Sequence, residues 1–198
     1  MGELFGTDGI RGEAGKYPIT PQMMVRIGRA AGRFFGKKND ELVVIGHDGR
    51  KSAKGLARGL AAGLQASGIR VGTAGLIPTP GVAFLVRDLK AAAGIVISAS
   101  HNPYRDNGVK FFNADGFKLS SSQEAALEKM ICSEPAPDLP LRDDPQSLPG
   151  ARERYRDFLI EAFPSDLTLA GTKLVLDCAN GAASPVAPDV FSRLGAEI

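Results

Sequence analysis

One short stretch of the sequence combines small polar residues with a serine and a histidine in a pattern that could support catalysis. The apolar run at residues 93–98 is followed at once by Ala99-Ser100-His101-Asn102-Pro103. A short apolar run bounded by polar residues is typical of a buried strand, and a proline restricts the backbone of the residue before it. The pattern therefore predicts that the hydroxyl of Ser100 is fixed at the end of a strand.

A serine hydroxyl needs a base or a charged partner before it acts as a nucleophile. His101 is adjacent to Ser100, but side chains of sequence neighbours seldom face each other well enough to form a direct pair. The G-x-S-x-G pattern of acyl-transfer enzymes is absent, which disfavours a catalytic triad. A polar turn that simply ends a strand is the alternative, and the local pattern alone does not decide between the two interpretations.

Two further segments combine glycines with basic side chains, which favours an anionic ligand. The opening at residues 5–12, Phe-Gly-Thr-Asp-Gly-Ile-Arg-Gly, lets the backbone approach an anion, and Arg11 offers a planar guanidinium for phosphate. Residues 46–52, Gly-His-Asp-Gly-Arg-Lys-Ser, precede an expected helix N-terminus and add the charge of Arg50. Neither segment is a P-loop. For each alone a simple turn is the alternative, but together with the serine segment they favour a phosphorylated ligand.

The expected secondary structure brings these segments to the ends of strands. Apolar runs predict buried strands at residues 42–45, 69–74 and 93–98. Helical spacing predicts helices at about 21–34, 52–67, 81–89 and 121–131, with Thr20 and Ser52 as N-cap residues. Residues 109–119 predict a hairpin with its turn at 113–116. Alternating strands and helices indicate an α/β fold, whose ligands bind beyond the carboxyl ends of the strands.

The composition changes between residues 133 and 150, which predicts a boundary. Five prolines lie there among aspartates, with few large apolar side chains, as in a linker. We therefore expect residues 1–150 to form one domain and residues 151–198 to begin a second α/β domain that is cut off. In that second part the pattern predicts a helix at about 155–163, a strand at 173–177 and a helix at 186–194.

Composition and charge argue against several classes of partner. A content of 43% hydrophobic and 23% charged residues is ordinary for a globular protein, and a net charge of +2 from scattered residues favours neither nucleic acid nor a membrane surface. No apolar run approaches the roughly 20 residues that span a bilayer. Two distant cysteines and two histidines form no zinc-site pattern. We expect reduced thiols in a cytoplasmic protein.

The segments described above resemble the α-D-phosphohexomutase superfamily. Residues 98–103, Ser-Ala-Ser-His-Asn-Pro, match its active-serine signature T/S-x-S-H-N-P, and residues 107–110 match the continuation. The opening at residues 5–12 has the form typical of the phosphoglucosamine mutase branch, and residues 177–182 resemble the start of the family's second domain. The resemblance implies the N-terminal portion of such an enzyme, with a mixed, mostly parallel sheet sandwiched by helices and the start of a similar second domain.

The resemblance implies a phosphoserine enzyme in which Ser100 carries the transferable phosphoryl group. That group would pass to glucosamine 6-phosphate, the bisphosphate would reorient, and its 6-phosphoryl group would return to the serine and leave glucosamine 1-phosphate. The product would feed the synthesis of UDP-N-acetylglucosamine and peptidoglycan. One Mg²⁺ is implied for each active site, with Ser100 as a ligand through its phosphate and the remaining ligands beyond Ile198.

The same resemblance assigns roles to five further residues. Lys110 would be a general acid–base or electrostatic stabiliser, and Arg11 would hold the reacting hydroxyl and phosphate. His101 would support the phosphoserine loop. Arg50 and Asn102 would face the same cleft and bind substrate or phosphate.

Other features of the family do not occur in these 198 residues and are expected beyond Ile198. They are the Asp-x-Asp-x-Asp metal loop, the sugar-specificity loop and the C-terminal phosphate-binding domain. We therefore expect the chain alone not to complete a catalytic cycle. The resemblance implies a small phosphosugar as the substrate and makes a homodimer plausible. A phosphomannomutase or phosphoglucomutase, and a non-catalytic phosphosugar-binding module, remain the alternatives.

Overall fold

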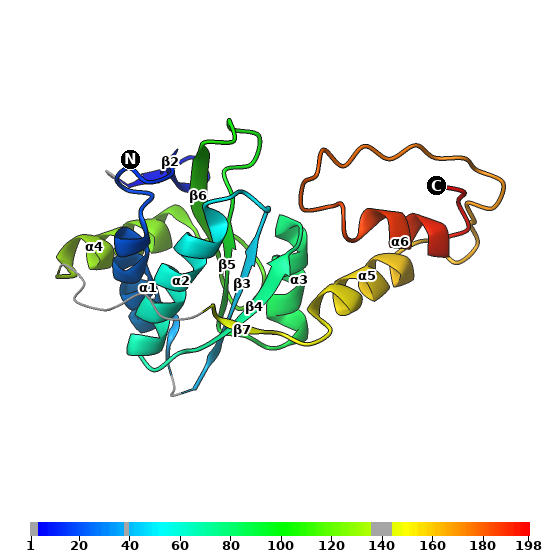
Figure 1. Ribbon diagram of the computed structural model, residues 1–198. Helices are drawn as coiled ribbons and strands as arrows, with labels where there is room; N and C mark the ends of the chain where they lie inside the picture. The colour runs from blue at the N-terminus through cyan, green and yellow to red at the C-terminus, as the bar shows by residue number, and fades with distance from the viewer. Residues whose placement is uncertain (1–3, 38–39, 136–143) are drawn as a thin grey trace.

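The computed structural model describes residues 4–37, 40–135 and 144–198 (Figure 1). Its described strands form one seven-stranded sheet in the order β1-β2-β6-β5-β3-β4-β7. Their bounds are Phe5–Gly6, Gly9–Glu13, Asp106–Phe112, Ala93–Ile97, Leu42–His47, Arg70–Leu76 and Gln146–Ser147, in that spatial order. Strands β5, β3, β4 and β7 run parallel to one another, whereas β1, β2 and β6 join by antiparallel pairing. The predicted mixed α/β sheet is confirmed.

Helices cover both faces of this sheet (Figure 1). One face packs against α1, α2 and α4, and the other against α3; α5 packs on α3 and α6 on α5, to the side of the sheet (Figure 1). The bounds of α1 to α6 are Pro21–Phe35, Ala53–Ala66, Thr79–Asp88, Ser121–Ser133, Ala151–Glu161 and Ala187–Arg193. In the residues that the structure describes, no helix combines the length and apolar character needed to cross a membrane.

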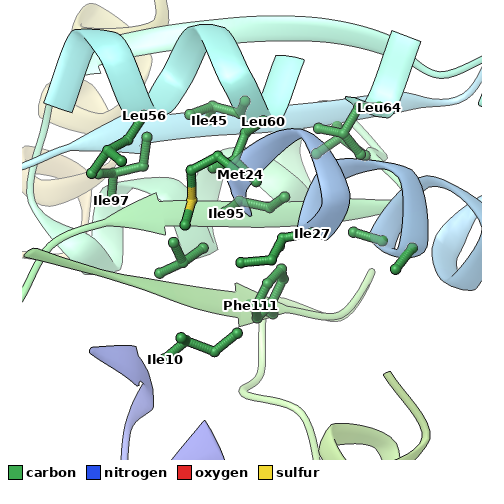
Figure 2. Packing of buried hydrophobic residues seen from close by; sticks show 14 of the residues in the cluster. Ile10, Met24, Ile27, Ile45, Leu56, Leu60, Leu64, Ile95, Ile97 and Phe111 are labelled. Carbon is green, nitrogen blue, oxygen red and sulfur yellow. The ribbon is translucent and has the colours of Figure 1, made fainter. Parts of the chain in front are cut away.

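The alternation of side chains along the central strands divides the core into two clusters. On β3, Val43 and Ile45 belong to the cluster under α1 and α2, whereas Val44 belongs to the cluster under α3. The same alternation on β5 places Ile95 and Ile97 in the first cluster. Figure 2 shows both isoleucines among the leucines and methionine that α1 and α2 contribute. Successive side chains of a strand point to opposite faces of the sheet. Because helices cover both faces, the central strands are apolar on both.

The helix starts partly follow the sequence pattern. The Oγ of Thr20 accepts a hydrogen bond from the amide of Met23 at 3.1 Å and caps α1 as predicted. Ser52 precedes α2, but its side chain makes no capping hydrogen bond. Its Oγ instead accepts a hydrogen bond from Nδ2 of Asn107 at 2.9 Å, so Ser52 ties the start of α2 to β6.

Helices α1 and α2 lie so close that their backbones touch. A Cβ at Gly63 would lie 2.1 Å from the carbonyl oxygen of Val25, and one at Gly28 would lie 2.3 Å from that of Leu60. Real Cβ atoms do not approach a backbone oxygen so closely. These two glycines therefore set the distance between the helices that cover this face of the sheet.

Two segments that precede α4 in the sequence, the opening segment and residues 117–119, differ from the sequence-based expectation. The opening segment forms strands β1 and β2, which its glycine-rich composition did not predict. Residues 117–119 do not form a second hairpin strand, since only Lys118 makes a bridge, to Phe112. The turn itself forms as predicted, because the amide of Asn113 donates to the carbonyl of Phe117 at 2.8 Å.

The C-terminal third also differs in two places. Within the predicted linker, residues 146–147 add strand β7 to the edge of the sheet, while residues 136–143 lie outside the described part of the chain. The predicted strand at 173–177 is wrong: Lys173 makes one bridge to Glu197, and Val175 is fully exposed. A strand needs a partner along its length, and a single bridge does not provide one.

Helices α5 and α6 form close to their predicted positions. The ring of Phe84 on α3 stacks on Phe158 of α5 with centroids 4.4 Å apart, and Tyr155 is buried in the same cluster. Helix α5 therefore packs on α3, although the sequence analysis assigned it to a second domain. The division of the chain at residue 150 stays a prediction.

The contact between α1 and α2 predicts opposite effects for two substitutions on the same helix. Gly63→Ala places a methyl group against backbone and should lower the free energy of unfolding by about 1–3 kcal/mol. Gly55→Ala has only Pro21 Cγ nearby, at 3.9 Å, and should raise it by up to about 1 kcal/mol through helix propensity. Urea unfolding of both variants measures the difference. A Gly63→Ala protein as stable as the parent would refute the backbone contact.

Candidate active site

The loop between β5 and β6 presents Ser100 at the carboxyl end of the parallel strands. Ser98 is buried, and its Oγ donates to Oδ2 of Asp48 at 2.7 Å and accepts from the amide of Ser100 at 2.9 Å. Ser100 itself is exposed and has a φ of +57°, in the left-handed region. Such a conformation is costly for a residue with a side chain and persists only where the surroundings impose it. The serine position predicted from the sequence is therefore a strained, well-supported one.

The turn after β3 carries Arg50, the residue that holds the serine loop in this conformation. His47 Nδ1 accepts a hydrogen bond from the amide of Gly49 at 3.1 Å, and Oδ1 of Asp48 accepts from the amide of Arg50 at 3.3 Å. Burial lowers the pKa of His47, which favours the neutral ring that accepts this bond. The turn thereby directs the Arg50 side chain under the serine loop.

All five N–H groups of the Arg50 guanidinium are engaged within the protein. The side chain is only 10% exposed. The acceptors are Asp48 Oδ2 at 2.9 Å and the carbonyl oxygens of Ser100 at 2.8 Å, Asn102 at 3.0 Å, Pro103 at 2.6 Å and Asp106 at 3.0 Å. Because no donor is left over, this arrangement does not support the prediction that Arg50 binds phosphate. It instead makes Arg50 the support of the loop.

The side chain of Asn102 likewise makes its hydrogen bonds around the loop, although the residue also lines a cavity beside Ser100. Its Oδ1 accepts from Nη1 of Arg11 at 3.1 Å, and its Nδ2 donates to Oδ2 of Asp106 at 3.1 Å. Nη1 of Arg11 also reaches the carbonyl of Ala99, at 3.4 Å. Through these bonds Arg11, on β2, ties the opening hairpin to the serine loop.

His101 makes a long contact with the serine. Its Nδ1 lies 3.4 Å from Oγ of Ser100, at the outer limit of a hydrogen bond. A catalytic triad needs a third group that orients the histidine. In the part of the chain that the structure describes, no hydrogen bond to the His101 ring other than this one is found.

Lys110 reaches the site through a carboxylate that the sequence analysis did not single out. Its Nζ lies 2.8 Å from Oδ2 of Asp8, and Nζ of Lys118 lies 2.7 Å from Oδ1 of the same group. Burial raises the pKa of Asp8, but hydrogen bonds and charge from the two lysines outweigh it and hold that pKa well below its usual range. Asp8 therefore stays ionised. Its place in the glycine-rich opening was the one available signal, whereas nothing local marked Lys118.

Ser100 and His101 line two neighbouring cavities. One, of about 490 Å³, is also lined by Thr7, Asp8 and Arg11 of the opening hairpin. The other, of about 850 Å³, lies between the loop and residues 179–182. Both have the size of small-molecule sites. The exposed hydroxyl thus meets a space with charged groups on one side and the C-terminal segment on the other.

The described residues do not by themselves form a metal centre. Across residues 4–37, 40–135 and 144–198, no three histidine, cysteine, aspartate or glutamate side chains come together in a way that could hold an ion. Asp48, which lines the larger cavity beside Ser100, already pairs with Arg50 and accepts a hydrogen bond from Ser98. The donor set of this chain therefore does not fit Mg²⁺ unless further ligands are supplied.

The last residue of the chain, Ile198, contributes no ligand to this site. Its side chain is a hydrocarbon, the residue is 48% exposed, and it lines neither of the two cavities beside Ser100. The sequence analysis placed the remaining Mg²⁺ ligands beyond Ile198, and that placement stays a prediction. Of the predicted metal ligands, only Ser100 is among the described residues, and it would bind the ion through its phosphate.

Comparison with known proteins agrees with this arrangement. Residues 2–137 match the family described as phosphoglucomutase/phosphomannomutase, alpha/beta/alpha domain I, which is more than half of the chain. The chain belongs to this family. Ser100, Lys110, Arg11, His101, Arg50 and Asn102 all lie within the matched range of the phosphoglucomutase/phosphomannomutase domain.

Relatives extend the likeness over the whole chain. A curated protein from Chromobacterium violaceum, named phosphoglucosamine mutase, is 46% identical over 99% of this chain and 45% of its own length. A crystal structure of a protein from Thermus thermophilus matches with a TM-score of 0.82 and 32% identity, over 98% of this chain and 44% of that one. A phosphoglucomutase/phosphomannomutase family protein from Burkholderia thailandensis gives 0.76 and 30%, over 95% and 41%. The chain spans less than half the length of these relatives.

Removing the guanidinium under the loop should be costly. Arg50→Met removes the charged partner of Asp48 and the guanidinium donors of four carbonyl oxygens, and we expect the free energy of unfolding to fall by about 3 kcal/mol, as for other broken ion pairs that are largely buried. Arg193→Met is the matched control, because its pair with Asp189 at 3.0 Å is about half exposed and should cost less than about 1 kcal/mol. Equal losses in urea unfolding would show that Arg50 does not support the loop.

Asp8 should contribute stability that depends on pH. Its pKa is depressed in the folded state, so the contribution is complete above the unfolded value of about 3.9 and is lost as the pH falls toward the folded value. The difference in melting temperature between the parent and Asp8→Asn should be largest near neutral pH and shrink progressively below about pH 4. Thermal unfolding between about pH 7 and pH 2.5 tests this. A difference that does not change with pH would contradict the ion pairs.

Proposed function

We propose that this chain is the serine-bearing part of a phosphoglucosamine mutase, which interconverts glucosamine 6-phosphate and glucosamine 1-phosphate. The observation that carries the proposal is the exposed, left-handed Ser100 at the mouth of a cavity that Arg11 also lines. The curated relatives that match the whole chain, including the one from Chromobacterium violaceum, carry the name phosphoglucosamine mutase. That protein's activity is not by itself this chain's, but the serine loop offers the same chemistry.

In the proposed reaction Ser100 Oγ is bonded to phosphorus at the start and at the end of each cycle. A sugar hydroxyl attacks that phosphorus, the P–Oγ bond breaks, and the sugar becomes a bisphosphate. In the reverse sense Oγ attacks the other phosphoryl group of the reoriented sugar and its ester bond breaks. A phosphoryl group in transit spreads negative charge over three oxygens, so nearby cations stabilise the transition state. Arg11 and Lys110 carry the charge that this step needs.

The remaining residues divide into those that act at the phosphoryl group and those that hold the loop. We assign Lys110 one of two roles: it transfers the proton of the reacting hydroxyl, or it stabilises the negative charge that develops on the phosphoryl group. We assign His101 a contact with the serine oxygen through Nδ1. Arg50 and Asn102 position the loop, because their polar atoms already bind loop carbonyls and side chains. This assignment replaces direct phosphate binding by Arg50 with the support of Ser100.

Mg²⁺ stays part of the proposal, with the Ser100 phosphate as one ligand and the others expected beyond Ile198. When bound, the ion would neutralise charge on the phosphoryl group. The substrate is proposed to be a small phosphosugar, and the full-length protein is proposed to be cytoplasmic and to form a homodimer. We expect the chain alone not to turn over substrate, because the proposed sugar and metal ligands are not among its residues.

A phosphomannomutase or phosphoglucomutase is the second candidate. It is favoured by the Burkholderia thailandensis structure, which belongs to the phosphoglucomutase/phosphomannomutase family by its own description. Competition among glucosamine, mannose and glucose phosphates in the full-length protein decides between the substrates. The preferred sugar is the one with the highest kcat/KM.

The phosphoserine proposal predicts the result of a single substitution in the full-length protein. Ser100→Ala removes the oxygen that carries the phosphoryl group, and kcat should fall by at least about 10³-fold, as for other covalent nucleophiles. Intact-mass analysis should also show loss of a phosphate carried by the parent protein.

Ser133→Ala is the matched control, because Ser133 is exposed at the end of α4 and its Oγ donates to the backbone carbonyl of Met130 within the same helix. It should keep both the phosphate and the turnover. A Ser100→Ala protein with the parent's turnover would end the mutase proposal and favour a phosphosugar-binding module.

A further inference from the structure

A single carboxylate, that of Asp8, gathers three cations from separate parts of the chain. Nη2 of Arg11 lies 2.5 Å and Nζ of Lys110 2.8 Å from Oδ2, and Nζ of Lys118 lies 2.7 Å from Oδ1. Arg11 is on β2, Lys110 is on β6, and Lys118 follows the turn after β6. Asp8 itself lines the cavity that Ser100 and His101 also line. The carboxylate therefore joins the opening hairpin to the cations of the proposed site.

The fold fixes the position of Asp8 from two sides. Asp8 lies in the two-residue turn between β1 and β2, where Gly6 pairs with Gly9. A Cβ at Gly9, which has a φ of +80°, would lie 2.2 Å from the carbonyl oxygen of Val109, so the turn rests directly on β6. On the other side, the carboxylate of Glu128 accepts hydrogen bonds from the amides of Leu4 and Phe5 at 3.1 and 3.3 Å. This scaffold leaves Asp8 little freedom to move away from Lys110.

The three cations need such a partner, because like charges this close repel each other in a partly buried site. The side chain of Lys110 is only 10% exposed and that of Asp8 30% exposed. Glu124 on α4 is a further acid that faces this cluster. Burial raises the pKa of Glu124; the charge of Lys118 opposes this rise and the charge of Asp8 adds to it, and the pKa is raised overall. The pKa of Asp8 lies far below neutral, so Asp8 is too weak a base to take a proton at neutral pH. Its contribution is therefore electrostatic and geometric.

We propose that Asp8 is a positioning residue of the active site, which holds the ammonium group of Lys110 and the guanidinium of Arg11 at the cavity that Ser100 lines. The inference rests on the proposed function, because it concerns the groups assigned to the transferring phosphoryl group. One carboxylate among three cations leaves the cluster with a net positive charge beside the cavity that Ser100 lines. Asp8 thus sets where that charge lies without cancelling it.

The positioning of Lys110 can be measured on the chain itself, without any assay of turnover. Brief acetylation at neutral pH, followed by mass spectrometry of peptides, gives the labelling rate of each lysine. Asp8→Asn should raise the rate at Lys110 by about tenfold, because the ammonium loses its anionic partner and moves toward solvent. Glu13→Gln is the matched control: it removes an exposed acid on the same hairpin, paired with Lys16 at 2.8 Å, and should leave Lys110 unchanged.

The second measurement uses the full-length protein. Asp8→Asn should lower kcat by about 10²-fold and change KM by less than about threefold, because a catalytic group displaced by about 1 Å loses rate rather than affinity. Asp8→Glu keeps the charge but adds a methylene, so it should also lose kcat while keeping the parent's melting temperature. Glu13→Gln should keep both constants.

The two measurements separate the inference from the function it rests on. Unchanged labelling of Lys110 in Asp8→Asn would overturn the inference, whatever the enzyme does. Parent-like kcat in both Asp8→Asn and Asp8→Glu would overturn it as well. If the full-length parent has no mutase activity, the proposed function fails, while a tenfold rise in labelling still supports the hold of Asp8 on Lys110. If Asp8→Asn does not fold, Asp8→Glu decides by the same two readouts.

Discussion

The guanidinium of Arg50 is the group on which the candidate site depends. Its side chain is only 10% exposed, it pairs with Asp48, and its remaining donors bind four carbonyl oxygens of the loop between β5 and β6 and of the first residue of β6. Those carbonyls turn toward the guanidinium, which supplies a donor to each of them. The loop held in this way contains the left-handed backbone at Ser100, an exposed residue that lines both cavities. A lysine would not replace this group, since it lacks the planar fork that reaches several acceptors.

The second constraint is the antiparallel edge of the sheet. Strand β6 returns beside β5 and then pairs with β2, so the first residues of the chain lie next to a loop about ninety positions further along. Arg11 and Asp8 reach the site only because of this pairing. On the face of the sheet that α1 and α2 cover, glycines let these two helices pack backbone to backbone. The sheet is thereby held between two layers while its carboxyl edge stays open (Figure 1).

Charge distinguishes this edge from an ordinary polar loop. Arg50 is neutralised by Asp48 and gives its donors to the loop, whereas the cluster around Asp8 keeps an excess of positive charge beside Ser100. The pair of Arg50 and Asp48 supports a loop, whereas the cationic cluster lies beside a cavity. This difference suits a phosphorylated ligand, and it agrees with membership of the phosphoglucomutase/phosphomannomutase family.

The sequence alone determined the elements with a strong local signal. The apolar runs of β3, β4 and β5 and the periodicity of α1 and α2 identified them, because burial on both faces or on one stripe leaves a pattern in neighbouring residues. The motif around Ser100 identified the family, which no single physical property of the segment would have done. The expected strand at 173–177 failed, because a strand depends on partners that its own residues do not encode.

Only the tertiary structure decided what each charged residue does. In the sequence Arg11 and Arg50 look alike, each in a glycine-rich segment, yet Arg50 gives its donors to Asp48 and to backbone carbonyls, whereas Arg11 joins the serine loop to the carboxylate of Asp8. Asp8 and Lys118 are 110 positions apart, and their contact exists only because β2, β6 and the following turn meet. Hydrogen-bond partners and burial set the role of an ionisable group, and both depend on segments distant in the chain. Local patterns therefore gave the elements and the family, and the packing of the sheet edge gave the roles.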